Sequence, residues 1–218
     1  MRVVIAGGHG QIALLLEQQL AARGDAATAL VRNPDHFGDV QSAGAVPVLC
    51  DLESEDLDSV AAYLNGADAA VFAAGAGAGS GAARKDTVDY GAAALFASAA
   101  VEAGVRRFVQ ISSVGIESAE SPDVDPEFAV YLKAKKMAEE DLRGRDLDWT
   151  VLRPGRLVND PATGLVTLAE PRLPRGSVTR ADVAAVVAEL LSARNTVGKT
   201  LELVNGSTAV GDAVRAVL

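Results

Sequence analysis

A tyrosine and a lysine stand four residues apart in this sequence, at Tyr131 and Lys135. On a helix this spacing puts both side chains on one face, where an ammonium group stabilises a phenolate and lowers the pKa of the phenol. Such a pair suits general acid–base chemistry, and a serine hydroxyl of the nearby Ser112-Ser113 could hold a carbonyl or alcohol group. The spacing also arises by chance. An ordinary amphipathic helix, with Tyr131 half-buried and Lys133, Lys135 and Lys136 on a basic outer face, is the alternative.

A glycine-rich loop follows the first apolar run of the chain and leads into a helical pattern. It reads Gly7-Gly8-His9-Gly10-Gln11-Ile12-Ala13. A strand, a glycine turn and a helix N-terminus gather free backbone N–H groups and the positive end of a helix dipole, which together bind phosphate. Gly7 allows the tight turn, Gly10 lets a pyrophosphate approach, and Ala13 lets the helix pack closely. We therefore expect a dinucleotide at Gly7, Gly8, His9, Gly10, Gln11 and Ile12, with His9 either touching the ligand or merely exposed.

The end of the second apolar run indicates which dinucleotide is bound. Domains selective for NAD usually place Asp or Glu there to bind the ribose hydroxyls, whereas this chain has Arg32-Asn33. The guanidinium of Arg32 can hold the 2′-phosphate of NADP and stack beside adenine. A surface arginine that starts a loop is the alternative. The sequence favours NADP (NADPH) over NAD, with Arg32 and Asn33 at the adenosine end.

The ends of the third and fourth apolar runs complete the predicted cofactor site. Asp51 and Leu52 follow the third run, and Asp51 either accepts from the adenine amine or caps the next helix. Ala73, Ala74 and Gly75 are small enough for the nicotinamide half of a dinucleotide to lie against the sheet. The Gly- and Ala-rich loop 75–85 is either a mobile lid or a flexible connection.

Together these motifs resemble the short-chain dehydrogenase/reductase superfamily, and most closely its atypical branch of small NAD(P)-binding proteins, often described as epimerases or dehydratases. The resemblance covers nearly the whole chain. It is carried by the glycine loop, Ser112-Ser113, Tyr131 with Lys135, Leu152-Arg153-Pro154-Gly155, and Arg180-Ala181-Asp182-Val183-Ala184.

The resemblance implies that Ser113, Tyr131 and Lys135 are the active-site Ser, Tyr and Lys, and that Lys135 also binds the nicotinamide ribose. The superfamily usually adds an Asn on its long helix, and here Asp89 stands in for it. Many members of the branch keep only part of the active site, so the resemblance implies binding more firmly than catalysis. The further residues that it places beside the cofactor are Ser112, Pro154 and Gly155.

Short apolar runs alternate with longer helical stretches, which predicts a parallel sheet covered by helices on both faces. The expected strands are Arg2–Ala6, Ala26–Val31, Val46–Leu49, Ala69–Ala73, Phe108–Ser112 and Thr150–Arg153, with Thr200–Val204 at the far edge. The expected helices are Gln11–Arg23, Asp86–Ala103, Glu127–Arg143, Ala181–Leu191 and Val210–Val217. We predict an α/β fold of the Rossmann type, with a doubly wound, mostly parallel sheet in a single domain over residues 1–218. A small segment, about 156–178, lies on the substrate side.

The composition limits the class of partner. The 218 residues carry a net charge of −9, and such an acidic surface repels nucleic acid and anionic lipid. No signal peptide or membrane-length apolar run is visible. We expect a cytoplasmic protein with a small-molecule substrate, no nucleic-acid, membrane or metal partner, and either a monomer or a homodimer.

Three functions are compatible with these residues. An NADP(H)-binding oxidoreductase that acts on an unidentified small carbonyl or alcohol compound by hydride transfer is favoured, because Ser113, Tyr131 and Lys135 occur together. An NAD(P)-dependent epimerase or isomerase that keeps its nucleotide and returns the hydride is the second. A non-catalytic NADP(H) redox sensor is the third.

Overall fold

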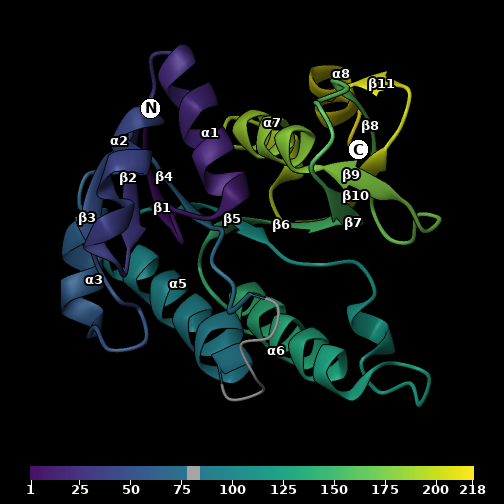
Figure 1. Cartoon of the computed structure of the whole chain (residues 1–218), viewed down its shortest axis with the longest axis horizontal. Coiled ribbons are helices and arrows are strands. Elements are labelled where there is room, and N and C mark those ends of the chain that lie inside the picture. Colours follow the sequence, from purple (N-terminus) through teal and green to yellow (C-terminus); the bar gives the residue numbers. More distant parts are fainter. Residues whose placement is uncertain (78–83) are drawn as a thin grey trace.

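The computed structural model describes residues 1–77 and 84–218, and within them it has the predicted Rossmann-type α/β architecture (Figure 1). The main sheet is built from β1 (Arg2–Ala6), β2 (Ala26–Val31), β3 (Val46–Leu49), β4 (Ala69–Phe72), β5 (Arg107–Ile111), β6 (Asp148–Pro154), β8 (Leu165–Ala169), β10 (Lys199–Asn205) and β11 (Thr208–Ala209). Its order over the described residues is β11-β8-β10-β6-β5-β4-β1-β2-β3. Strands β1 to β6 and β10 pair in parallel, whereas β8 and β11 are antiparallel to their neighbours. A separate parallel pair is formed by β7 (Arg156–Val158) and β9 (Ser177–Thr179).

Helices cover both faces of this sheet (Figure 1). They are α1 (Gln11–Ala22), α2 (Phe37–Ser42), α3 (Leu57–Leu64), α5 (Ala93–Glu102), α6 (Pro126–Arg143), α7 (Arg180–Leu190) and α8 (Val210–Arg215), with the π-helix η2 (Lys85–Ala92) and the 3₁₀ turns η1 (Pro34–His36), η3 (Ile116–Ser118) and η4 (Arg194–Thr196). Helices α1 and α7 lie on one face, and α3, α5 and α6 lie on the other. None of the helices in the described part of the chain is long and apolar enough to cross a membrane.

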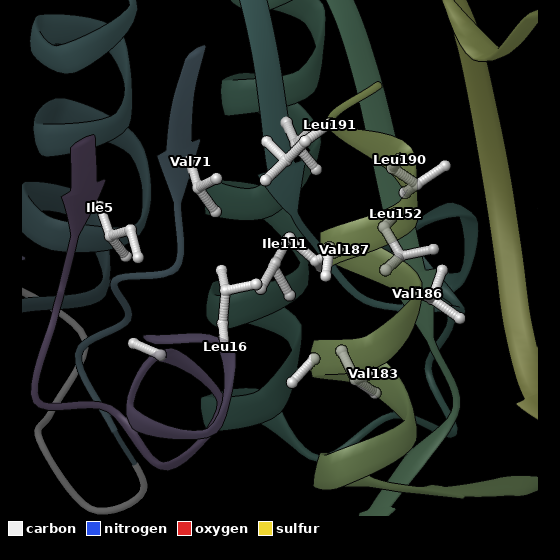
Figure 2. Close-up of a cluster of buried hydrophobic side chains, with 14 of the residues drawn as sticks. Ile5, Leu16, Val71, Ile111, Leu152, Val183, Val186, Val187, Leu190 and Leu191 are labelled. Atoms are coloured by element: carbon white, nitrogen blue, oxygen red, sulfur yellow. The ribbon is translucent and has the colours of Figure 1, made fainter. Parts of the chain in front are cut away.

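Each face of the sheet has its own apolar core. On one face, side chains of the central strands meet α1 and α7; Figure 2 labels Ile5, Leu16, Val71, Ile111, Leu152, Val183, Val186, Val187, Leu190 and Leu191. On the other face, the rings of Phe72, Phe96 and Phe108 pack in series at tilted angles, with centroids 6.3 and 5.7 Å apart. Because successive side chains of a strand point to opposite faces, continuous apolar strands supply both cores at once.

The prediction that Thr200–Val204 forms the far edge of the sheet is wrong. This run belongs to β10, which lies between β6 and β8. The segment predicted to lie on the substrate side, 156–178, folds back and supplies β8, which pairs antiparallel with β10 and then with β11. Val166 of β8 is fully buried, so this strand extends the core and displaces β10 from the edge.

Two helical predictions also need correction. The single helix expected over Asp86–Ala103 is divided into the π-helix η2 and the α-helix α5. Helices α2 and α3 were not predicted, because both are short. Of the loop 75–85, residues 78–83 lie outside the described part of the chain, so its predicted role as lid or connection stays open.

Candidate functional site

Two glycines of the loop after β1 lie so close to the neighbouring strands that neither position has room for a side chain. Gly7 has a positive φ of 78°, and an added Cβ would lie 2.6 Å from the Cα of Ala74 at the end of β4. A Cβ on Gly8 would overlap the side chain of Ala29 in β2. Gly10 is the N-cap residue of α1, where no side chain caps the helix and no acidic residue occupies the first turn. The positive end of α1 is therefore open to an anion.

A cleft with about 840 Å³ of empty space, open to solvent, extends from this loop across the carboxyl ends of the first four strands. Many predicted cofactor residues line it: Gly7, His9, Gly10, Arg32, Asp51, Leu52, Ala73, Ala74 and Gly75. Sequence reasoning missed three further polar residues of the lining, namely His36, Glu53 and Arg84. They come from three separate parts of the chain, namely η1, the turn after β3 and the start of η2.

Asp51 borders this cleft, and the alternative that it caps the next helix is wrong. Its Oδ1 accepts a hydrogen bond from the backbone N–H of Glu53 at 3.1 Å. The N-cap of α3 is Asp56, whose side chain accepts from the backbone N–H of Ser59 at 2.8 Å. The carboxylate of Asp51 is thus held by its own turn beside the cleft.

The histidine of the glycine loop is paired with a second histidine. The rings of His9 and His36 stack with centroids 3.6 Å apart, and His9 Nε2 lies 2.8 Å from the carboxylate of Asp39. Both rings line the cleft, so His9 is more than an exposed turn residue. His36 follows Arg32 and Asn33 closely in the chain, which is the signal that sequence reasoning could have used.

The remaining predicted cofactor residues lie outside the lining of this cleft: Gly8, Gln11, Ile12, Asn33, Ser112, Lys135, Pro154 and Gly155. Asn33 is the N-cap of η1, where its side chain accepts from the backbone N–H of Asp35. Gln11 borders a second, shallow cavity with Asn159 and Arg180. Gly155 is pressed against the backbone of Gly176, beside β9.

Lys135 is buried and points to the ends of β4 and β5, so the basic outer face proposed as an alternative does not include it. Its side chain is 5% exposed, and its Nζ lies 3.1 Å from Oδ1 of Asp89 on η2. The ammonium also donates to the carbonyl oxygens of Ala74 and Ile111, at 3.5 and 3.4 Å. Burial alone would lower the pKa of Lys135, but the negative charges of Tyr131, when ionised, and of Asp89 outweigh it and raise this pKa.

Tyr131 lies between two lysines. Lys135 Nζ is 5.8 Å from the centre of its ring, and Lys85 Nζ is 5.4 Å from it. Lys85 was not predicted from the sequence; it is almost fully buried and comes from the first residue of η2. Lys85 and Asp89 lie four residues apart on η2 and face Tyr131 and Lys135 on α6, so the two helices together assemble this group.

Ser113 does not complete a hydrogen-bonded triad in the described structure. Its hydroxyl donates to the carbonyl oxygen of Val114 at 3.1 Å, and no hydrogen bond joins it to Tyr131. The neighbouring Ser112 donates instead to the buried carboxylate of Glu139 at 2.6 Å. The structure therefore brings Tyr131, Lys135 and Asp89 together, and in the described residues no hydrogen bond joins Ser113 to any of them.

A buried ionic network supports α6 beneath these residues, and sequence reasoning missed it. The guanidinium of Arg153, at the end of β6, binds both carboxylate oxygens of Glu139 through Nε and Nη2, at 2.9 and 2.8 Å. Its Nη1 binds Glu117 of η3 at 2.5 Å. Glu139 stands four residues beyond Lys135, so helical spacing could have pointed to it.

Comparison with known proteins agrees with this geometry. A family model described as NAD(P)H-binding matches residues 7–194. The chain belongs to this NAD(P)H-binding family.

Individual relatives of this NAD(P)H-binding chain span its full length. A Bacillus subtilis protein, the "Uncharacterized sugar epimerase YhfK", is 33% identical over 99% of both chains. A solved Bacillus halodurans structure, named as a candidate NAD-dependent epimerase/dehydratase, has 34% identity and a TM-score of 0.91 over 99% of both chains. The Lactococcus lactis oxidoreductase YlbE has 26% identity and a TM-score of 0.86, over 99% of this chain and 96% of its own. The predicted resemblance to epimerase/dehydratase-like and reductase-like members of the superfamily is confirmed.

The residues of the cleft fit a nicotinamide dinucleotide. The uncapped end of α1 and the glycines of the loop match a pyrophosphate, and the cleft continues from there over Ala73, Ala74 and Gly75 toward Lys135. At the other end, Arg32 and Arg84 supply positive charge beside Asp51. The family that the chain belongs to is described as NAD(P)H-binding, and the residues that line the cleft agree with it.

Proposed function

We propose that the protein binds NADPH and uses it to reduce a carbonyl group on a small molecule. The observation that carries this proposal is the buried ion pair of Lys135 and Asp89 beside Tyr131, directly next to the cleft at the carboxyl ends of β4 and β5. In open α/β sheets this edge is where ligands bind. A proton donor held there can act on a substrate that meets the nicotinamide.

The preference for NADPH is argued from charge. Arg32 lines the adenosine end of the cleft, where its guanidinium can bind a 2′-phosphate with two hydrogen bonds. We assign Asp51, which borders the cleft, to accept from the adenine amine, and the first turn of α1 to hold the pyrophosphate. Lys135 is the group that we assign to the nicotinamide ribose.

Each residue of this site would then have its own role in the reduction. Bound NADPH supplies a hydride to the carbonyl carbon of the substrate. The hydroxyl of Tyr131 donates its proton to the carbonyl oxygen, so an alcohol and NADP⁺ are the products. Lys135 stabilises the phenolate that remains, and Asp89 holds Lys135 in place. Ser113 can bind the substrate oxygen only if its hydroxyl turns away from Val114.

The substrate is expected to be small. The segment 156–178 borders the proposed substrate side, and because it supplies strands to the sheet it is not a separate domain. A bulky nucleotide-sugar needs a larger covering region than this segment offers. The proposal therefore names a small aldehyde or ketone.

A second candidate is an epimerase or isomerase that retains its nucleotide. The names of YhfK and of the Bacillus halodurans protein favour it. Such a protein would purify with nucleotide bound and would consume no NADPH overall. A redox sensor, the third candidate, would bind NADPH and keep its function when Tyr131 is replaced by Phe.

Titration of the purified protein with NADPH and NADH, followed by nicotinamide fluorescence, tests the cofactor. We expect NADPH to bind at least about tenfold more tightly, and Arg32→Glu to remove this preference, because the substitution replaces a phosphate ligand with a repelling charge. If the wild type binds NADPH and NADH equally well, or if Arg32→Glu leaves the ratio of these affinities unchanged, Arg32 does not bind the 2′-phosphate.

Tyr131→Phe tests the chemistry. NADPH consumption is measured with a panel of small aldehydes and ketones, and we expect the variant to lose a factor of about 10² to 10⁴ in turnover with unchanged cofactor affinity. Tyr63→Phe, on α3, is the matched control and should retain wild-type turnover. Wild-type activity in Tyr131→Phe would show that Tyr131 has only a structural role.

A further inference from the structure

Glu53 joins two arginines at the adenosine end of the cleft. Its Oε2 accepts from Arg32 Nη1 at 3.5 Å and from Arg84 Nη2 at 2.5 Å. Its Oε1 accepts from the hydroxyl of Thr87 at 2.7 Å. Arg32, Glu53 and Arg84 all line the cleft that begins at the glycine loop. The cluster is therefore part of the cofactor cleft rather than a separate surface feature.

The three charged groups come from three different parts of the chain. Arg32 follows β2, Glu53 follows β3, and Arg84 directly precedes η2. Two guanidinium groups face one carboxylate, so the cluster keeps one net positive charge. The side chains of Arg32, Arg84 and Glu53 are 54%, 35% and 25% exposed, which leaves them within reach of a ligand.

The ion pairs of this cluster are of the kind that a ligand can replace. Partly exposed pairs contribute little net free energy, because water and side-chain entropy offset most of the attraction. A phosphate monoester has up to two negative charges and three acceptor oxygens, and it accepts paired hydrogen bonds from guanidinium groups. It is thus a stronger partner for Arg32 and Arg84 than the single carboxylate of Glu53.

We propose that Arg84 is the second arginine of a 2′-phosphate subsite, and that Glu53 is the carboxylate that competes with the phosphate for both arginines. The inference rests on the proposed function, since it takes NADPH as the ligand. Glu53 then sets how strongly the protein discriminates NADPH from NADH. NADH has no phosphate to displace this carboxylate.

Glu53 and Arg84 have opposite effects on the affinity for NADPH. Removing the charge of Glu53 frees both arginines and removes a repulsion from the phosphate, so NADPH binds more tightly. Removing Arg84 takes away one phosphate partner, so NADPH binds more weakly. Neither change acts on the pyrophosphate, and the affinity for NADH therefore stays nearly constant.

The test measures calorimetric affinities for NADPH, NADH, adenosine 2′,5′-bisphosphate and AMP. For Glu53→Gln we expect NADPH and the bisphosphate to bind about fivefold more tightly, with NADH and AMP within about twofold of wild type. For Arg84→Met we expect the affinities for NADPH and the bisphosphate to fall about tenfold, whereas the affinities for NADH and AMP change little. Glu55→Gln removes the same charge two residues away, where no ion pair joins Glu55 to either arginine in the described residues, and it should match wild type.

Two results would overturn the inference. Unchanged or weaker NADPH binding in Glu53→Gln would show that the carboxylate does not compete with the phosphate. Equal weakening of NADPH and NADH in Arg84→Met would show that Arg84 does not bind the phosphate. Arg84→Lys, which keeps the charge, serves as a second variant if Arg84→Met does not fold.

The bisphosphate separates this inference from the proposed function. If the wild type binds adenosine 2′,5′-bisphosphate but neither NADPH nor NADH, the proposed function fails while the two arginines keep their role. If the wild type binds the bisphosphate no better than AMP, the phosphate subsite itself is absent and the inference is wrong.

Discussion

Glu139 and Glu17 are buried on opposite faces of the sheet, and the two carboxylates have opposite surroundings. Glu139, on α6, has no exposed surface and accepts hydrogen bonds from Ser112, Arg143 and Arg153. Glu17, on α1, is equally buried, yet neither of its carboxylate oxygens has a hydrogen-bond partner in the described residues. Burial therefore raises the pKa of Glu17 to about 8, and at neutral pH the group is mostly protonated.

The difference shows which face of the sheet needs a fixed geometry. Tyr131, Lys135 and Glu139 follow one another at intervals of four residues along one side of α6. Because Glu139 is tied to the ends of β5 and β6, the rotation of α6 is set, and with it the direction of Tyr131 and Lys135. Glu17 on the opposite face holds no such partner and only weakens the packing of α1.

Replacement of Glu139 by Ala should have the largest effect. It leaves Nε and Nη2 of Arg153, in a residue that is 4% exposed, without the carboxylate that binds them, and only the bond from Nη1 to Glu117 remains. Breaking a buried ion pair in this way costs about 3–5 kcal/mol, which should appear as a lower free energy of unfolding in urea. Glu140→Ala, at the exposed neighbouring position, is the control. A loss no larger than that of the control would mean that the network does not hold α6.

Glu17→Met should raise the free energy of unfolding, by up to ~3 kcal/mol at pH 7. The pKa of Glu17 in the folded state, about 8, lies above its ordinary value of 4.5, so the folded protein keeps a proton that the unfolded chain releases. The free energy of unfolding of the wild type therefore falls as the pH rises from about 4.5 to about 8.

Urea unfolding of the wild type and of Glu17→Met at several pH values measures this difference. We expect the free energies of unfolding of the two proteins to be similar near pH 4.5, the ordinary pKa of the Glu17 carboxyl. They should diverge as the pH rises to about 8, the pKa of Glu17 in the folded state. Gln18→Met, at an exposed position of α1, controls for the added apolar side chain. A constant difference between wild type and variant at all pH values would show that Glu17 is already ionised in the folded protein.

Arg143→Ala should have the smallest effect of the three. Arg143 donates to Glu139 at 2.6 Å, but its side chain is 35% exposed. Because Arg153 still pairs with Glu139, we expect a loss below about 1 kcal/mol in the same urea measurement. A loss as large as that of Glu139→Ala would make Arg143, and not Arg153, the main partner of this carboxylate.

The sequence was informative where structure depends on neighbours along the chain. The central strands, the glycine loop and the helix bearing Tyr131 and Lys135 all have local patterns, and their predicted bounds agree with the structure within a few residues. The resemblance to a superfamily named Lys135 and Asp89 as active-site residues, but the burial of Lys135 beside Asp89 was not predicted. The affinity of the site for NADPH over NADH stays a prediction.

The features that sequence reasoning missed depend on residues far apart in the chain. Glu53 meets Arg84, and Glu139 meets Arg153, only because parallel strands end at one edge of the sheet. The position of β10 depends on β8, whose five residues pair in a direction that no local pattern fixes. A single polar residue at a turn carries no information about which distant partner it will meet.

The two borders of the main sheet have a consequence for self-association. At one border β3 is four residues long and contains Pro47, which has no N–H to donate; at the other, β11 has only two residues. A strand from another molecule would find few backbone groups with which to extend the ladder. The exposed Val46 and Leu49 of β3 therefore lie on a border that resists fibril-like growth, although both side chains are apolar.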